Sequence, residues 1–296
     1  MKKILKYLLI IFVAVNLLIL ISGRSWLYKA ISITYLKGYT SSYINDFIYL
    51  PSNTIKPGKH KKWGISKDYN KANLPELIKP VNESLETVAF LVIINDSIHF
   101  EKYWHGYSDS SVSNSFSISK SWVSTLIGIA ISEGKIKSVD QKVCDFLPDF
   151  CEGRNRELSI KNLLTMSSGL NWGEDYYNPI GQAAEAYYGN HLSDLIKNLT
   201  VIETPGKVFK YNSACTQLLT FIVEEATGET ISEYASKKLW QPMGAKHPAL
   251  WSTDFEGGDE KGFCCINSNA RDFSRLGKLY MHQGNWDGTQ LLDSSY

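Results

Sequence analysis

The strongest hydrophobic pattern in the chain is the apolar run at residues 7–21, which is broken only by Asn16. Three lysines, at positions 2, 3 and 6, precede this run. A basic start followed by an apolar stretch is typical of an export signal. Positive charge before a membrane segment keeps the amino terminus in the cytoplasm, so everything after Arg24 is expected on the other side of the membrane.

The residues that follow this run favour a segment that stays attached to the protein. The run ends in Ser22-Gly23-Arg24 and not in the Ala-x-Ala type of sequence at which signal peptides are cleaved. Trp26 and Tyr28 come next, and both residue types are common at a membrane interface. We therefore expect residues 1–24 to form an uncleaved signal anchor with a transmembrane helix. Secretion after signal cleavage is the alternative.

The region at residues 25–84 lacks a clear period of apolar positions. Its polar residues are interrupted by Pro51, Pro57, Pro75 and Pro80. Such a composition predicts an extracytoplasmic stalk with little regular structure. The domain proper is expected at residues 85–296.

A β-hairpin is expected at the start of this domain. Residues 87–94 form a run rich in β-branched side chains, and residues 98–104 alternate between apolar and polar positions. Asn95-Asp96-Ser97 between them provides the turn signal.

Helical spacing dominates the remainder of the chain. In residues 117–132 the side chains of Val123, Ile127, Ala130 and Ile131 fall on one helical face, and Gly134 supplies a stop signal. Further helices are expected at residues 158–166, 192–199, 213–226, 231–239 and 270–281. The pattern predicts an α+β domain with a large helical part.

Strands are scarce after the hairpin, up to Tyr296. A sheet of two strands is marginal alone and leaves open edges. Either helices cover the hairpin, or the strands that complete the sheet lie beyond this sequence. In the second case the chain is cut short at Tyr296.

Composition excludes some partners. The chain has 296 residues, of which 44% are hydrophobic and 21% are charged, as expected of a globular protein with a sizeable core. The net charge is +1, and the only cluster of like charge is the short basic patch at residues 59–62. Nothing in this balance favours nucleic acid as a partner.

The five cysteines argue for a disulfide and against a metal. Cys144 and Cys151 are close enough in an exported chain to close a small loop. The other three, Cys215, Cys264 and Cys265, are expected to act as buried small hydrophobes. None has metal-ligand spacing with a histidine, so neither a metal nor another cofactor is expected.

The candidate chemistry lies at the start of the helix predicted at residues 117–132. Ser117 precedes Lys120 by three residues, which places the hydroxyl and the amine on one helical face. A hydroxyl needs a base to become a nucleophile, and a lysine can serve when burial and the positive helix end disfavour its charged form. The same spacing occurs at Ser132 and Lys135, but there it lies at a polar helix end beside Gly134. Context therefore favours Ser117 over Ser132 as nucleophile, with Lys120 as base. On spacing and context alone, an ordinary serine at the start of a helix is the more common interpretation.

A third candidate lies at the junction between a loop and the helix predicted at residues 213–226. Tyr211 can pass a proton to a leaving group if nearby cations lower its pKa. Considered alone, Tyr211 is more typical of an ordinary packing aromatic whose hydroxyl is satisfied by the backbone.

Several ordered motifs extend this pattern. They are Phe116-Ser117-Ile118-Ser119-Lys120-Ser121, Asp145-Phe146-Leu147-Pro148, Leu163-Leu164-Thr165-Met166-Ser167-Ser168-Gly169-Leu170, Pro205-Gly206, Tyr211-Asn212-Ser213, Thr227-Gly228 and Asn269-Ala270-Arg271-Asp272-Phe273. In this order they resemble the serine β-lactamase and penicillin-binding protein superfamily. The likeness is closer to its class C-like branch, which includes D-aminopeptidases, esterases and 6-aminohexanoate-oligomer hydrolases. It covers roughly residues 85–296.

The resemblance implies a β-lactamase/transpeptidase-like fold, α+β with an antiparallel sheet, and a serine hydrolase that cleaves a small-molecule or peptide-like amide or ester. Ser117 would be the acylated nucleophile, Lys120 its base and Tyr211 the proton shuttle. Two departures stand out. Ser213 occupies the position of the family's Asn in Tyr-x-Asn, where its hydroxyl can still donate to a substrate carbonyl. The family's third motif, of Lys-Thr-Gly or His-x-Gly type, does not follow Tyr211.

Other functions remain open on the sequence. A Ser/His/Asp triad on a Gly-x-Ser-x-Gly turn is excluded because no such run exists. A binding or sensor module that becomes acylated without turnover is the first alternative. An inactive truncated fragment is the second.

Overall fold

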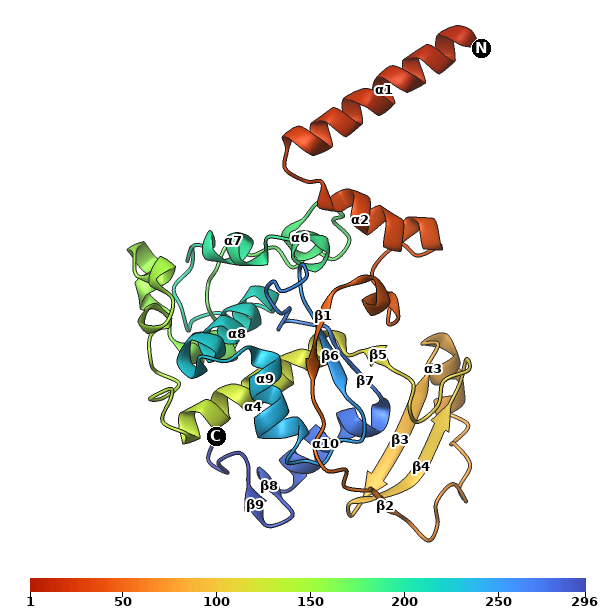
Figure 1. Ribbon diagram of the computed structural model, residues 1–296, viewed down its shortest axis with the longest axis vertical. Coiled ribbons are helices and arrows are strands. Elements are labelled where there is room, and N and C mark those ends of the chain that lie inside the picture. The colour runs from red at the N-terminus through yellow and green to blue at the C-terminus, as the bar shows by residue number, and fades with distance from the viewer.

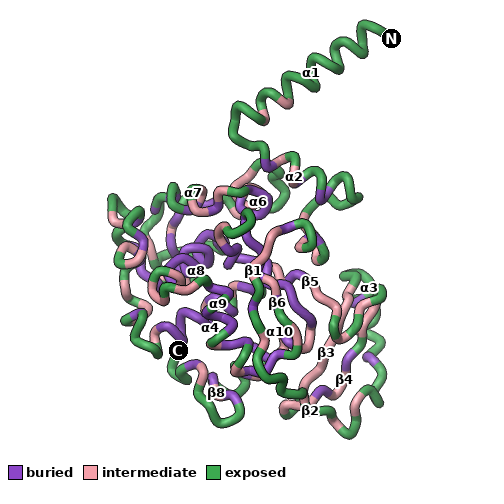
Figure 2. Tube along the Cα trace, in the orientation of Figure 1, coloured by how far each residue is buried: buried purple, intermediate pink, exposed green.

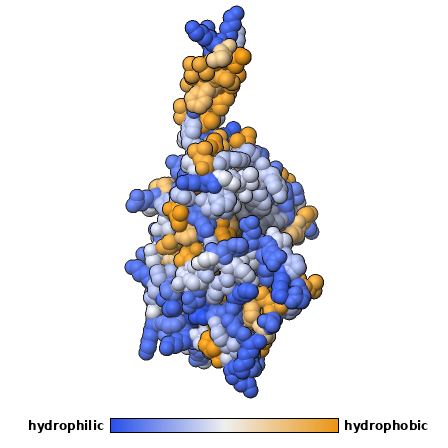
Figure 3. Space-filling model, turned by 90° about the vertical axis from the view of Figure 1, so that its right-hand side faces the viewer, coloured by the Kyte–Doolittle hydropathy of each residue, from blue (hydrophilic) through white to orange (hydrophobic).

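The first helix stands apart from the rest of the molecule. In the computed structural model, which describes residues 1–296, α1 (Lys2–Ile21) extends away from the globular part and buries none of its residues (Figures 1 and 2). Its surface is apolar along most of its length (Figure 3). With a mean hydropathy of 2.8 it is long and apolar enough to cross a membrane, a test that signal sequences also pass.

The segment between residues 25 and 84 contains regular structure and packs on the domain. The α2 helix (Trp26–Ile33) buries Trp26, Ala30 and Ile33 in the main hydrophobic core. Strand β1 (Ser52–Ile55) pairs antiparallel with β6 (Ala249–Ser252). Strand β2 (Gly64–Ile65) and helix α3 (Ile78–Ser84) follow.

The expectation of little regular structure in this segment is therefore wrong. The elements are only two to eight residues long, too short for a local period. What stabilises them is contact with distant parts of the chain.

The predicted hairpin is confirmed, but the scarcity of later strands is not. Strands β3 (Ala89–Ile94) and β4 (Ser97–Tyr103) pair antiparallel, and β2 lies parallel to β4. A separate four-stranded sheet has the order β1-β6-β7-β5, all antiparallel, with β5 at Ser113–Asn114 and β7 at Ile266–Ser268. These strands have two to four residues, and β7 is buried throughout. They therefore do not show the alternation of apolar and polar residues that marks a half-exposed strand.

The predicted helices are confirmed, with shifted ends. They are α4 (Ser119–Ser132), α5 (Ile160–Leu164), α7 (Leu192–Lys197), α8 (Ser213–Thr227), α9 (Ile231–Ala235) with a π-helical turn after it, and α10 (Ala270–Met281). The pattern of apolar positions did not predict helix α6 (Gln182–Tyr188) or the small hairpin of β8 (Asn285–Trp286) and β9 (Thr289–Gln290). Helices α4 and α8 pack together and form the most deeply buried part of the domain (Figures 1 and 2).

The arrangement is the expected α+β fold, with helices gathered beside an antiparallel sheet (Figure 1). The loop before β7 brings the sheet into close contact with α8. A Cβ added at Gly262 would lie 1.7 Å from Oγ1 of Thr220 on α8, so only glycine allows the loop before β7 to approach the helix this closely.

The cysteines form two disulfides. Cys144 and Cys151 are bonded, as expected. Cys264 and Cys265 are bonded to each other, which corrects the expectation that both are free hydrophobes, although both are buried. Cys215 is free and buried, as expected.

A half-buried carboxyl group, Glu224, faces the buried Glu260 near the carboxyl end of α8. Burial and the charge of Glu260 raise the pKa of Glu224 from 4.5 to about 8. Burial also raises the pKa of Glu260, which accepts hydrogen bonds from Nδ2 of Asn53 at 2.9 Å and from the backbone N–H of Ser232 at 3.1 Å. The fold thus favours a protonated Glu224 at neutral pH.

This pair predicts a pH dependence of stability. Between pH 4.5 and about 8 the folded chain holds a proton on Glu224 that the unfolded chain releases, so its contribution to the free energy of unfolding declines as the pH rises. Glu224→Gln, which mimics the protonated acid, is expected to lose less stability than the wild type between pH 5 and pH 8 in urea unfolding of the detergent-solubilised protein. The exposed neighbour provides the control, Glu225→Gln. Equal pH dependence in wild type and Glu224→Gln would contradict the prediction.

Candidate active site

Ser117 and Lys120 meet at the start of the central helix. Ser117 is exposed and lies in a short 3₁₀ turn (Phe116–Ile118), and Lys120 lies in the first turn of α4. The Lys120 Nζ donates a hydrogen bond to Oγ of Ser117 at 3.1 Å. It also donates to the backbone carbonyl of Phe263 at 2.6 Å. The amine is therefore fixed between the candidate nucleophile and the loop that leads into β7.

The backbone turns sharply just before Ser117. Phe116 has φ +45°, in the left-handed region that bulky residues rarely adopt. Its N–H donates to Oδ1 of Asn114 at 2.9 Å, and the N–H of Ser115 donates to the carbonyl of Ile266 on β7 at 2.8 Å. Strain of this kind persists only where surrounding bonds enforce it. Here they leave the Ser117 side chain exposed.

A chain of hydrogen bonds through two buried side chains holds Asn114 in place. Its Nδ2 donates to the Tyr187 hydroxyl at 3.1 Å, and that hydroxyl donates to Oδ1 of Asp46 at 2.7 Å. Burial raises the pKa of Asp46 to about 6. The turn before Ser117 is thus connected by hydrogen bonds to the segment at residues 25–84.

Opposing effects act on the amine of Lys120. Burial lowers the pKa of Lys120 to about 8, while the negative charge of Glu174 acts in the opposite direction. A lysine with this pKa is partly neutral near physiological pH, so it can accept a proton from a hydroxyl.

Tyr211 lies beside this pair. The Lys120 Nζ is 5.2 Å from the centre of the Tyr211 ring. The tyrosine is 38% exposed, and its hydroxyl makes no hydrogen bond within the chain. The structure therefore brings Tyr211 close to Lys120 with a hydroxyl that is accessible to a bound molecule.

Ser213 is placed differently from the other candidates. It is the first residue of α8, only 4% exposed, and its Oγ donates to Oε1 of Glu174 at 2.5 Å. Because a serine hydroxyl has one proton, a substrate carbonyl would have to displace that bond. Glu174 was not found from the sequence, where the only signal was a pair of acidic residues, Glu174 and Asp175, after the Gly- and Asn-rich stretch at residues 168–173.

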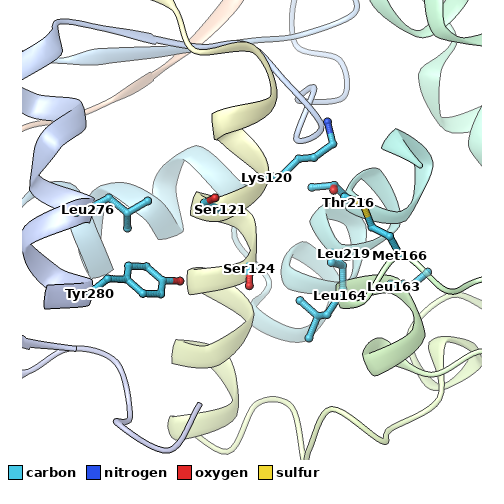
Figure 4. A pocket seen from close by; sticks show the side chains of 11 residues that line it. Lys120, Ser121, Ser124, Leu163, Leu164, Met166, Thr216, Leu219, Leu276 and Tyr280 are labelled. Atoms are coloured by element: carbon cyan, nitrogen blue, oxygen red, sulfur yellow. The ribbon is translucent and has the colours of Figure 1, made fainter. Parts of the chain in front are cut away.

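A pocket extends from Lys120 along α4. Its volume is about 460 Å³, and leucines from α5, α8 and α10 line it together with Ser121 and Ser124. Figure 4 shows Lys120 at its upper edge. No group of three or more His, Cys, Asp or Glu side chains gathers in a way that could hold a metal ion.

The geometry can be set against known proteins. The sequence model of the family described as Beta-lactamase matches residues 74–263, well over half of the chain. This chain belongs to the beta-lactamase family. The resemblance and the fold expected from the sequence motifs are thereby confirmed.

Individual members of the beta-lactamase family give the same result. The chain is 27% identical over 234 residues to a 6-aminohexanoate-dimer hydrolase from Paenarthrobacter ureafaciens, covering 75% of this chain and 59% of that protein. It is 26% identical over 151 residues to a protein of Escherichia coli K12 provisionally named a D-alanyl-D-alanine carboxypeptidase, covering 48% of this chain and 34% of that one. The chain thus spans less than two thirds of the length of these relatives.

A solved structure supports the fold. A Bacillus anthracis protein provisionally named a 6-aminohexanoate-dimer hydrolase superposes with a TM-score of 0.74 at 21% identity, covering 92% of this chain and 74% of that one.

The support behind Ser117 gives a stability prediction. Asn114→Ala removes the acceptor of the Phe116 N–H and the donor to the Tyr187 hydroxyl. The Phe116 N–H is left unpaired, and the Tyr187 hydroxyl keeps only its bond to Asp46. This loss is expected to lower the free energy of unfolding by about 1–3 kcal/mol, measured by urea titration. The control is Ser113→Ala on the same strand, where no side-chain hydrogen bond is lost. The prediction fails if the two variants unfold at the same urea concentration.

Proposed function

We propose that this chain is a serine hydrolase that cleaves an amide or ester through an acyl-enzyme on Ser117. The observation that carries the proposal is the 3.1 Å hydrogen bond between the half-buried Lys120 amine and the exposed Ser117 hydroxyl. A nucleophile within reach of a base whose charged form is disfavoured is the arrangement that acyl transfer requires.

The mechanism follows from the side chains in place. Neutral Lys120 takes the proton of Ser117 as Oγ bonds to the substrate carbonyl carbon. The first turn of α4 offers backbone N–H groups to the negative charge that develops on the carbonyl oxygen. Tyr211 hands a proton to the leaving group as its bond to carbon breaks, which leaves the acyl group on Ser117. Water then attacks the acyl carbon and gives a proton to the Tyr211 oxygen. As the bond from that carbon to Ser117 Oγ breaks, protonated Lys120 returns a proton to Oγ and the acid product is released.

The names of relatives support the reaction class. A 6-aminohexanoate-dimer hydrolase and a provisional D-alanyl-D-alanine carboxypeptidase are both hydrolases by name. We propose a small-molecule or peptide-like amide or ester as substrate. Ser213 would contact it only if the substrate displaces the hydrogen bond to Glu174.

Covalent labelling tests the proposal directly. Intact-mass analysis after treatment with a fluorophosphonate is expected to show one adduct on the wild type and none on Ser117→Ala. Ser121→Ala, one helical turn further along and part of the pocket lining, is the matched control and should still be labelled. An adduct that survives in Ser117→Ala would refute Ser117 as nucleophile. Labelling without turnover of any ester would favour a sensor-type module.

We also propose that α1 anchors the chain and that residues 85–296 carry the hydrolase outside the cytoplasm. Three lysines before an apolar helix of 20 residues support this orientation. The segment at residues 25–84 would then brace the domain, because α2 and β1 contribute to its core and sheet.

Protease added to intact spheroplasts is expected to digest the domain and to leave α1 protected in the membrane. A domain that is digested only after the membrane is permeabilised would contradict the proposed orientation. Recovery of the domain in the medium without residues 1–24 would instead indicate cleavage of the signal.

A further inference from the structure

We propose that Glu174 is a positioning residue of this site, which fixes the Tyr211–Ser213 turn and the start of α8 beside Lys120. The inference deepens the proposed function and rests on it. Glu174 lies in the loop before α6, 39 residues from Ser213 in sequence.

Four donors converge on the Glu174 carboxylate. Its Oε2 accepts from Nε1 of Trp172 at 2.5 Å and from the backbone N–H of Ser213 at 2.7 Å. Its Oε1 accepts from Oγ of Ser213 at 2.5 Å and from the Tyr176 hydroxyl. A carboxylate bonded on both oxygens is oriented with little freedom, and hydrogen bonds to an ionised acceptor are the stronger kind.

The carboxylate also complements the end of α8. The first N–H groups of a helix lack partners within the helix and carry partial positive charge. Glu174 takes the N–H of Ser213, and the Asn212 side chain takes the N–H of Cys215 at 3.3 Å. Both bonds fix the backbone directly after Tyr211.

Tyr211 is restrained on its other side as well. The N–H of Lys210 donates to the carbonyl of Met166 at 2.9 Å. The backbone is therefore held on both sides of Tyr211, at Lys210 and at Ser213, while the Tyr211 hydroxyl makes no hydrogen bond within the chain. The fixed backbone on both sides places the tyrosine ring 5.2 Å from Lys120 Nζ, and Glu174 supplies the charged side-chain contact.

Glu174 also sets the charge that Lys120 experiences. The groups that face the amine are Ser117 and the Phe263 carbonyl, the Tyr211 ring, Cys215 on α8 and Glu174. Burial lowers the pKa of Lys120 to about 8, and the negative charge of Glu174 opposes that decrease. Removing the charge while the amine stays buried therefore lowers the pKa of Lys120 further.

The test is a pH profile of kcat/KM for p-nitrophenyl acetate with the full-length protein in detergent. For the wild type we expect activity to rise with pH, with a midpoint near 8, because Lys120 must be neutral to act as base. Glu174→Gln is expected to shift this midpoint to lower pH. It should also lower kcat about 10-fold or more with little change in KM, since Tyr211 is no longer held in place.

Two further variants separate charge from shape. Glu174→Asp keeps the charge on a shorter side chain and should restore the wild-type midpoint while kcat remains reduced. Asp175→Asn removes an exposed negative charge from the same loop and should leave both midpoint and kcat unchanged. A Glu174→Gln enzyme with the wild-type midpoint and kcat would overturn the inference. So would an Asp175→Asn enzyme that shows the same shift.

A measurement without turnover distinguishes this inference from the proposed function. Hydrogen exchange at the backbone amides of residues 213–216 should be faster in Glu174→Gln than in Asp175→Asn, because the tie to the start of α8 is lost. If Ser117 proves inert but exchange increases, the proposed function fails and the structural tie stands. If Ser117 is active and neither exchange nor the pH profile changes, the positioning role of Glu174 alone is refuted.

Discussion

The site depends on one half-buried amine, that of Lys120. Removing the Lys120 Nζ from water is unfavourable, and few groups compensate, namely the Ser117 hydroxyl, the Phe263 carbonyl and the charge of Glu174. Each comes from a different part of the chain, so the amine reaches this position only when the central helix, the loop before β7 and the loop before α6 are all assembled. The same burial lowers the pKa of Lys120, which is the property that its proposed role as a base requires.

The loop at residues 262–265 is the part that connects helix and sheet. Oγ of Ser119, next to Lys120, donates to the carbonyls of Gly262 at 2.6 Å and Cys264 at 3.0 Å. The absence of a side chain at Gly262 lets the loop contact Thr220 on α8. The Cys264–Cys265 disulfide joins adjacent residues at the end of the same loop, directly before β7. The loop thus places the Phe263 carbonyl where it accepts a hydrogen bond from the Lys120 amine.

Local patterns allowed prediction of the elements whose partners are near in sequence. The spacing of apolar side chains predicts the helices, and the turn signal at Asn95 predicts the hairpin. Strand β1 could not be predicted in this way, because Ser52 pairs with Ser252, 200 residues away, and four residues leave no period to read. Glu174 and Asn114 were missed for a similar reason. Each is an ordinary polar residue until the fold brings its partners to it.

The Ser-Lys pairs at the two ends of α4 show why spacing cannot define the site. Ser132 precedes Lys135 by the same three residues, yet its hydroxyl donates to the carbonyl of Gly128 within the helix, and Lys135 is exposed after Gly134. No loop supplies an acceptor there, and no burial disfavours the charged amine. At Ser117 the same spacing is joined by Phe263, 143 residues away along the chain from Lys120, and by a strained residue held from β5. The candidate site therefore depends on tertiary contacts, and the local motif contributes only the Ser117 hydroxyl and the Lys120 amine.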